Sequence, residues 1–187
     1  MGRVGPGVWL QGPVRRGVVV IFVTVGMHSL GFPRLVQAMD ELAAALDEDV
    51  VMQIGATPET PRHTRSFAFA TQAEMDHWCA TARVIVSQAG AGSILTAQKA
   101  RVPLVLVPRL NQYGEHIDDH QLELARILQR TGCALLVENV KELARALERA
   151  RHFTPAAPVR KGQLVAALRS LLANMETAGV RGAAERR

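Results

Sequence analysis

A run of small residues in the middle of the chain has the composition of a phosphate-binding loop. Its sequence is Gln88-Ala-Gly-Ala-Gly-Ser93, between an apolar stretch at 84–87 and a segment with helical spacing that begins at Gly92. Small side chains allow backbone amides and the positive end of a helix to approach an anion. Glycines also serve tight packing of a strand on a helix, so the run by itself leaves both roles open. It lacks the Gly-Lys-Ser/Thr of a Walker A motif and the complete Gly-x-Gly-x-x-Gly of a dinucleotide site, which disfavours an ATPase or a dehydrogenase.

A second group of polar side chains is concentrated at 108–121, between another apolar stretch and a predicted helix. Its acceptors and donors are Glu115, His116, Asp118, Asp119, His120 and Gln121. This set suits a ligand rich in hydroxyl groups, such as a sugar, and the alternative is a capped helix start with solvated side chains. The i, i+4 spacing of His116 and His120 fits a pair of metal ligands, but the Glu of His-Glu-x-x-His is missing. We therefore expect no metal and no cofactor.

The elements that must position these groups alternate along the chain. Continuous apolar runs rich in β-branched residues predict strands at 18–25, 50–54, 84–87, 104–107 and 134–137, with a short strand at 66–69. Helices are predicted from Pro33, over 74–80, from Gly92, from about Asp118 and from Lys141. The first of them carries an apolar stripe at Leu35, Met39, Leu42 and Leu46. Strands separated by helices require right-handed crossovers, so we predict a doubly wound α/β fold with one parallel sheet.

In open α/β sheets, ligands bind beyond the carboxyl ends of the strands. The loops after Val25, Ser87 and Val107 are therefore expected to face one crevice. The first of these loops contains His28, which as a lone histidine is more often a local hydrogen-bonding group than a catalytic one.

Three segments divide the chain. Residues 1–17 are rich in Gly and Pro and are expected to be a flexible tail, and residues 18–152 form the α/β domain. Residues 153–187 contain a linker, an amphipathic helix at about 162–178 and a basic tail. The apolar stripe of this helix suits packing back on the sheet or docking a partner, and both roles stay open. Its residues are Leu164, Leu168, Leu171 and Met175.

Composition limits the classes of function. The 187 residues are 48% hydrophobic, which excludes a wholly disordered protein, and only 4% aromatic, which disfavours stacking on single-stranded nucleic acid. Two cysteines are too few for a disulfide framework and favour a reducing cytoplasm. No apolar run approaches the ~20 residues of a membrane span. The basic residues behind the net charge of +5 are concentrated in 1–17 and 141–187, which favours an anionic surface or an acidic protein over nucleic acid as a partner.

Several of the motifs occur together in one known family. They are Ile21-Phe-Val-Thr-Val-Gly26, Gln53-Ile-Gly55, Val84-Ile-Val-Ser-Gln-Ala-Gly-Ala-Gly-Ser-Ile94, Pro103, Val107-Pro108 and His120-Gln-Leu-Glu-Leu-Ala125. In this order, over about residues 19–138, they resemble the sugar-nucleotide-binding half of family 28 GT-B glycosyltransferases. The stretch Gly114-Glu-His-Ile-Asp-Asp-His-Gln121 is most similar to the small catalytic subunits of two-part bacterial exopolysaccharide glycosyltransferases. The eukaryotic dolichol-linked N-acetylglucosaminyltransferase subunit is a more distant cousin.

The resemblance implies one half of a GT-B fold, a single Rossmann-like domain at 18–152 that binds a UDP-sugar. It assigns the donor diphosphate to Gly26, Gly90, Ala91, Gly92, Ser93 and Arg109. It assigns the ribose and the sugar to Thr96, Asp119, His120 and Gln121. Many relatives carry Glu where this chain has Thr96, so we expect weaker recognition of the ribose. The catalytic base would be His28, Glu115 or His116, or would come from a partner.

The resemblance also implies a second protein. The partner would be a membrane-anchored glycosyltransferase subunit that presents a lipid-linked saccharide acceptor, which would hold this cytoplasmic chain at the inner face of the cell membrane. Basic flanks fit an anionic leaflet. The expected reaction is an inverting, metal-independent transfer of a hexose or hexose derivative in exopolysaccharide or related glycan synthesis. Two alternatives stay open: a noncatalytic UDP-sugar-binding regulatory subunit, and a stand-alone nucleotide-sugar epimerase-like enzyme.

Overall fold

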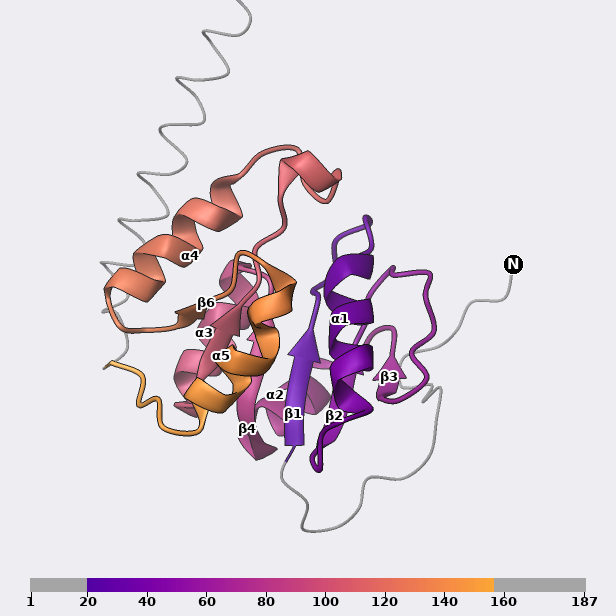
Figure 1. Cartoon of the computed structure of the whole chain (residues 1–187), viewed down its shortest axis with the longest axis horizontal. Coiled ribbons are helices and arrows are strands. Elements are labelled where there is room, and N and C mark those ends of the chain that lie inside the picture. The colour runs from indigo at the N-terminus through magenta and orange to yellow at the C-terminus, as the bar shows by residue number, and fades with distance from the viewer. Residues whose placement is uncertain (1–19, 157–187) are drawn as a thin grey trace, which may run out of the picture.

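The computed structural model describes residues 20–156, which form a parallel six-stranded sheet flanked by helices (Figure 1). The strands are β1 (Val20–Thr24), β2 (Asp49–Gln53), β3 (Arg65–Phe67), β4 (Ala82–Ser87), β5 (Leu104–Leu106) and β6 (Leu135–Leu136). Their spatial order is β3-β2-β1-β4-β5-β6. Successive strands are added on one side of β1 up to β3 and on its other side from β4 onward, so the strand order switches between β1 and β4. Doubly wound sheets bind ligands at such a switch point. The predicted α/β fold with one Rossmann-like sheet is confirmed.

Helices cover both faces of this sheet. They are α1 (Pro33–Ala43), α2 (Gln72–Thr81), α3 (Ala91–Ala100), α4 (His120–Arg130) and α5 (Leu143–Ala150), with 3-10 turns at Asn111–Tyr113 and Val140–Glu142. In Figure 1, α1 and α5 lie in front of the sheet, whereas α2 and α3 lie behind it. Alternate strand residues face opposite sides: Phe22 and Ile85 pack with α2, α3 and α4, whereas Ile21 and Val84 pack with α1 and α5. All four side chains are fully buried, as expected for strands covered on both faces.

Local sequence explains how three of the helices begin. Pro33 starts α1, where its missing N–H costs no hydrogen bond. At α2, Thr71 and Glu74 form a capping box, in which the Glu74 carboxylate accepts from the Thr71 backbone at 2.8 Å. Helix α4 begins at His120, close to the predicted start at about Asp118, and the Asp118 carboxylate accepts from the His120 backbone N–H at 3.1 Å, which has no acceptor within the helix.

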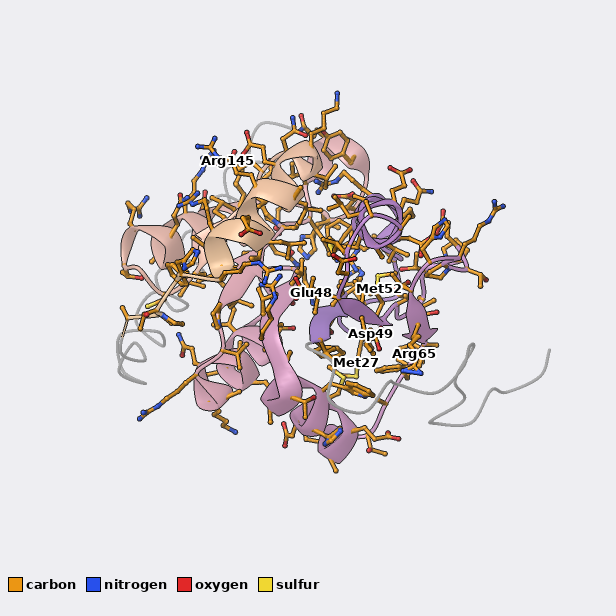
Figure 2. All side chains as sticks on the ribbon, turned by 60° about the horizontal axis from the view of Figure 1, so that its bottom comes forward. Met27, Glu48, Asp49, Met52, Arg65 and Arg145 are labelled. Atoms are coloured by element: carbon orange, nitrogen blue, oxygen red, sulfur yellow. The ribbon has the colours of Figure 1, made fainter. Side chains whose placement is uncertain are left out.

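A cluster of charges ties the domain together near the amino ends of the strands. The carboxylate of Glu48, labelled in Figure 2, is paired with the guanidinium groups of Arg83 and Arg151. Hydrogen bonding from Arg83 holds the pKa of Glu48 below its ordinary value, although burial acts against this. The ion pairs link Glu48 to β4 and to the end of α5, so these three charged side chains have a structural role.

Part of the predicted domain organisation lies outside the described residues. This holds for the tail at 1–17 and for the amphipathic helix at 162–178, and residues 153–156 alone represent the predicted linker. Within residues 20–156, every helix is too short or too polar to cross a lipid bilayer.

Candidate functional site

A crevice lies at the carboxyl ends of β1, β2 and β4, where the strand order predicts a ligand site. Its volume is about 300 Å³. Its walls come from three loops and from the facing sides of α2 and α3. The lining residues are Thr24, Gly26, Met27, Gln53, Phe69, Ala70, Gln72, Met75, Cys79, Ile85, Gln88, Gly90, Gly92, Ser93 and Thr96.

The Gly-rich loop, residues 88–93, forms one wall of this crevice. Gly90 is the N-cap of α3, and no side chain caps the first turn, so the backbone N–H groups of Ala91, Gly92 and Ser93 have no acceptor within the helix. A β-carbon at Gly92 would meet no atom within 4 Å. The loop therefore presents the positive end of a helix to open space, which is the arrangement that binds phosphate.

Gln88 adds a side-chain donor to the same wall. Its residue is 8% exposed, and its Oε1 accepts from the Ser87 hydroxyl at 3.1 Å, which fixes the amide. Its Nε2 has no hydrogen-bond partner within residues 20–156 and lies against Gly26 and Gly90. A β-carbon at Gly26 would collide with this nitrogen, and one at Gly90 would lie 3.0 Å from it. The two glycines thus leave room for an amide nitrogen that has no acceptor in the described residues and that a ligand oxygen can satisfy.

A second glutamine, Gln53, lies across the crevice. Its side chain is 3% exposed and is hydrogen bonded to Thr24, Gly26 and Ala68. Neither glutamine was predicted from the sequence to be a site residue. The available signal was a polar residue at the end of an otherwise apolar strand, at Gln53 and again at Gln88.

The remaining lining of the crevice is largely apolar. Burial raises the pKa of the Cys79 thiol to about 11, with Asp76 adding to the shift, so the thiol is neutral at pH 7. Met75 and Phe69 extend the same wall. The Thr96 hydroxyl donates to the Gly92 carbonyl at 3.0 Å, so one of its bonds is already made within α3. The crevice thus combines an apolar wall with one side-chain amide donor and one helix N-terminus.

The structure places Arg109 elsewhere than beside the Gly-rich loop. Its guanidinium is 1% exposed and donates to the backbone carbonyls of Gly31, Val25 and Glu115 at 2.6, 3.2 and 3.4 Å. It stacks on the Phe32 ring at 4.6 Å. Burial lowers its pKa, and Glu115 partly offsets that shift. These contacts belong to a buried side chain that does not line the crevice, so they favour a structural role for Arg109 over the predicted contact with a diphosphate.

Glu115 forms a two-bond ion pair. Its oxygens accept from Arg34 Nε at 2.8 Å and from Arg34 Nη2 at 2.7 Å, and from the Leu110 backbone N–H at 3.1 Å. The carboxylate is 6% exposed. Three donors therefore surround a buried group, an arrangement that favours a structural role for Glu115 over the predicted role of a base.

Two of the predicted histidines, His28 and His116, lie close to each other. The rings of His28 and His116 are 5.6 Å apart, which brings the loop after β1 against residues 108–121. His116 Nδ1 lies 3.0 Å from the Asp118 carboxylate. His28 Nδ1 accepts from the Leu30 backbone at 3.1 Å. Within residues 20–156, the Nε2 of each of these histidines has no hydrogen-bond partner.

One of the predicted sugar contacts keeps a nitrogen without a partner. Gln121 Oε1 accepts from the Arg109 backbone at 3.1 Å, whereas its Nε2 has no partner within residues 20–156. His120 Nδ1 makes no hydrogen bond there, but it lies 3.7 Å from the Glu123 carboxylate. By contrast, the Asp119 carboxylate accepts from the Asn111 backbone at 2.9 Å and closes the loop. Residues 20–156 hold no group of three or more His, Cys, Asp or Glu side chains arranged for a metal ion.

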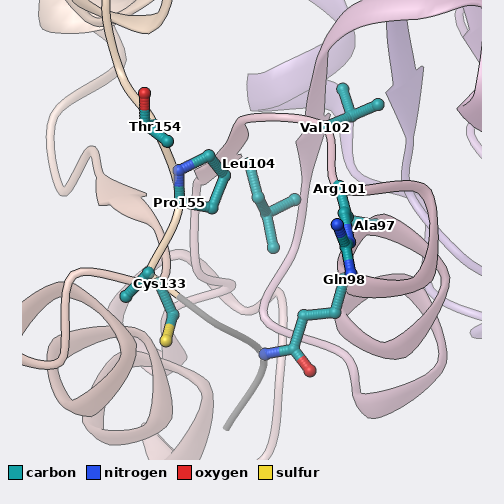
Figure 3. A pocket seen from close by; sticks show the side chains of 9 residues that line it. Ala97, Gln98, Arg101, Val102, Leu104, Cys133, Thr154 and Pro155 are labelled. Atoms are coloured by element: carbon teal, nitrogen blue, oxygen red, sulfur yellow. The ribbon is translucent and has the colours of Figure 1, made fainter.

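A second cavity of about 320 Å³ lies at the far end of α3 (Figure 3). It is lined by Ala97, Gln98, Arg101, Val102, Leu104, Cys133, Thr154, Pro155 and Ala156. None of the residues predicted from the sequence to bind a ligand is among them.

Comparison with known proteins gives one family and a set of similar structures. The family described as "Glycosyltransferase family 28 C-terminal domain" matches residues 20–173. No curated protein matches the chain. The glycosyltransferase SnogD from Streptomyces nogalater is 26% identical, with a TM-score of 0.53 over 90% of this chain and 41% of its own.

Two further structures have the same fold. The Streptomyces sp. SF2575 glycosyltransferase SsfS6, complexed with thymidine diphosphate, is 23% identical over 88% of this chain and 39% of its own, with a TM-score of 0.51. MurG of Acinetobacter baumannii is 20% identical over 76% of this chain and 47% of its own, with a TM-score of 0.50. The chain thus spans less than half of each protein to which it is similar.

Proposed function

This chain belongs to the family of glycosyltransferase family 28 C-terminal domains, and from that premise we propose that it is the donor-binding, catalytic part of a glycosyltransferase that uses a UDP-sugar. The observation that carries the proposal is the pairing of an uncapped α3 N-terminus with the unpartnered Nε2 of Gln88 in one crevice. Both features offer N–H donors to a diphosphate. The thymidine diphosphate in SsfS6 supports a pyrimidine nucleoside diphosphate as the ligand class.

The proposed chemistry is an inverting transfer without a metal ion. The acceptor oxygen attacks the anomeric carbon, the bond from that carbon to the β-phosphate oxygen breaks, and UDP leaves. The N–H groups of Gly92 and Ser93 stabilise the charge that develops on the phosphate, because they are oriented before the reaction. The acceptor proton goes to His28, to His116 or to a base of a partner.

The acceptor side of the reaction belongs to a partner in this proposal. The chain spans 41% of SnogD and 47% of MurG, which supports a second part of similar size. We propose a membrane-anchored subunit with a lipid-linked acceptor in exopolysaccharide or related glycan synthesis. The apolar stripe of the predicted helix at 162–178, outside the described residues, is the proposed contact with this partner. Replacing both Leu168 and Leu171 with Asp would then bury unpaired charge at the contact and release the chain from membranes that contain the partner. Co-sedimentation measures this, and UDP binding should survive.

Calorimetric titration tests the donor site. Wild-type protein should bind UDP and dTDP more tightly than GDP, since the pocket is proposed to take a pyrimidine. Gln88→Leu removes the amide and should weaken UDP binding by about 10-fold or more, the loss of one hydrogen bond to a charged group. Gln98→Leu is the matched control in the second cavity and should leave UDP binding unchanged. No UDP binding by folded wild-type protein, or equal losses in both variants, would contradict the proposal.

A further inference from the structure

We infer that Gln53 is a positioning residue that sets the shape of the donor crevice by holding its walls together through Gly26 and Ala68. The inference rests on the proposed function, because it concerns the same donor site. It adds a residue for which the sequence analysis gave no role.

All four hydrogen bonds of the Gln53 amide are made within the protein. Its Oε1 accepts from the Thr24 hydroxyl at 2.7 Å and from the Gly26 N–H at 3.1 Å. Its Nε2 donates to the Gly26 carbonyl at 3.0 Å and to the Ala68 carbonyl at 2.8 Å. A primary amide has two donors and two acceptor positions, so Gln53 is fully satisfied. A buried network of this kind fixes one arrangement of its members.

These bonds reach the two segments that follow β1 and β3. The registered pairs of β1 with β2 end at Thr24 and Gln53, and the pairs of β2 with β3 end at Gln53 and Phe67. Past these last pairs, the Gln53 side chain is hydrogen bonded to both the N–H and the carbonyl of Gly26, in the loop after β1. The same side chain donates to the Ala68 carbonyl, which also accepts from the Gly55 backbone N–H at 3.0 Å and immediately precedes two lining residues of the crevice, Phe69 and Ala70. The Gln53 side chain therefore links the Gly26 wall to a segment that the backbone already holds beside β2.

The contacts of Gly26 link Gln53 to the proposed phosphate contact. Gly26 has a φ of +76°, a conformation that favours glycine, and the space of its missing β-carbon is occupied by Gln88 Nε2. On the other side, a β-carbon at Gly55 would lie 2.8 Å from the Gly26 carbonyl. Gly26 is thus held between the amides of Gln53 and Gln88. A shift of Gly26 would move the surface against which the Gln88 donor rests.

A glutamate at position 53 separates this role from a general effect on stability. Gln53→Glu keeps the shape and both acceptor contacts, but its carboxylate would point an oxygen at the Gly26 and Ala68 carbonyls, and these oxygens repel. A protonated carboxyl can donate to one of them. Burial and the facing carbonyls both favour the neutral form, so the pKa of this carboxyl should be raised above that of an ordinary Glu. Donor affinity of the variant should then recover as pH falls.

The experiment measures UDP affinity by calorimetry for wild-type protein and Gln53→Glu at pH 5.5, 7 and 8.5. The ratio of the two dissociation constants at each pH removes the titration of UDP itself. At pH 8.5 the variant should bind about 10-fold or more weakly, the loss of a hydrogen bond that leaves buried acceptors unpaired, and at least half of that loss on a logarithmic scale should be recovered at pH 5.5. Met39→Ala, in the core on the other face of the sheet, is the control for lost stability and should keep wild-type affinity.

Each outcome decides between two roles. If the affinity ratio of Gln53→Glu does not change with pH, or if affinity in Met39→Ala falls as far for the same loss of melting temperature, Gln53 is structural and the inference is overturned. If folded wild-type protein does not bind UDP at any pH, the proposed function fails and this inference fails with it. UDP binding by wild-type protein together with a flat ratio overturns the inference alone.

Discussion

Two polar regions at the same edge of the sheet differ in how their hydrogen-bonding groups are used. In the crevice beside the Gly-rich loop, Gln88 Nε2 and the first turn of α3 have donors without acceptors in the described residues. In the segment 108–121, which we call the polar loop, the carboxylates of Glu115, Asp118 and Asp119 accept from backbone or side-chain groups of the same region. The loop with fewer polar residues has more capacity left for a ligand.

The difference shows that density of polar residues in a sequence is a poor measure of ligand binding. A loop without regular structure must satisfy its own backbone groups, and short polar side chains do this first. The Gly-rich loop has no such need, because it passes directly from a strand into a helix. Its glycines leave donors exposed where side chains would cover them.

The largest expected effect comes from a substitution that disrupts the polar loop and leaves the crevice unchanged. Glu115→Ala leaves the Arg34 guanidinium, whose side chain is 16% exposed, without its carboxylate partner, so we expect a loss of about 3 kcal/mol in the free energy of unfolding. Urea denaturation measures this. UDP affinity of the folded fraction should stay within about 3-fold of wild type, since no donor contact is lost. Glu123→Ala, at an exposed side chain of α4, is the control and should cost less than about 1 kcal/mol. A catalytic but structurally idle Glu115 would give the opposite result, with stability unchanged.

The next largest effect comes from a substitution that blocks the crevice and leaves the fold intact. Gly92→Val adds a branched side chain at the mouth of the proposed phosphate site. An added β-carbon there would have no protein atom within 4 Å, so the fold can accept it. We expect UDP affinity to fall by about 100-fold or more, because the backbone amides of α3 no longer reach the phosphate. Calorimetry gives the affinity, and circular dichroism checks the fold. Lys99→Val, near the other end of α3, should bind UDP normally. Unchanged affinity in folded Gly92→Val would remove the phosphate site from this loop.

The smallest effect tests the part of the polar loop that keeps free capacity. Gln121→Ala removes the Nε2 donor that has no partner in the described residues. It should weaken the binding of a UDP-sugar by about 5- to 10-fold and the binding of UDP by less than about 2-fold. Asn111→Ala loosens the same loop, because Asn111 Nδ2 donates to the Ile117 carbonyl at 2.7 Å, and it should not distinguish the two ligands. Equal losses of UDP and UDP-sugar in Gln121→Ala would move this side chain from the sugar to the scaffold.

Much of the fold was predictable because its signals are local. Runs such as Val20–Thr24 are apolar over consecutive residues, and the capping box of α2 spans four residues. The Gly-rich loop was found for the same reason. The contacts that shape the site join distant residues: Thr24 and Gln53 are 29 positions apart, and Arg34 and Glu115 are 81 apart. A single glutamine or arginine gives no spacing to read, so Gln53, Gln88 and the burial of Arg109 emerged from the structure.

The most direct test of the account maps UDP onto the backbone. In an amide correlation spectrum of the ¹⁵N-labelled chain, UDP should shift the resonances of Gly90, Ala91, Gly92 and Ser93 most, with Gly26 next, because these residues border the proposed diphosphate site. Residues 108–121 should shift little with UDP and more with a UDP-sugar. Shifts confined to 108–121, or to the second cavity around Gln98 and Cys133, would contradict the assignment of the donor to the crevice.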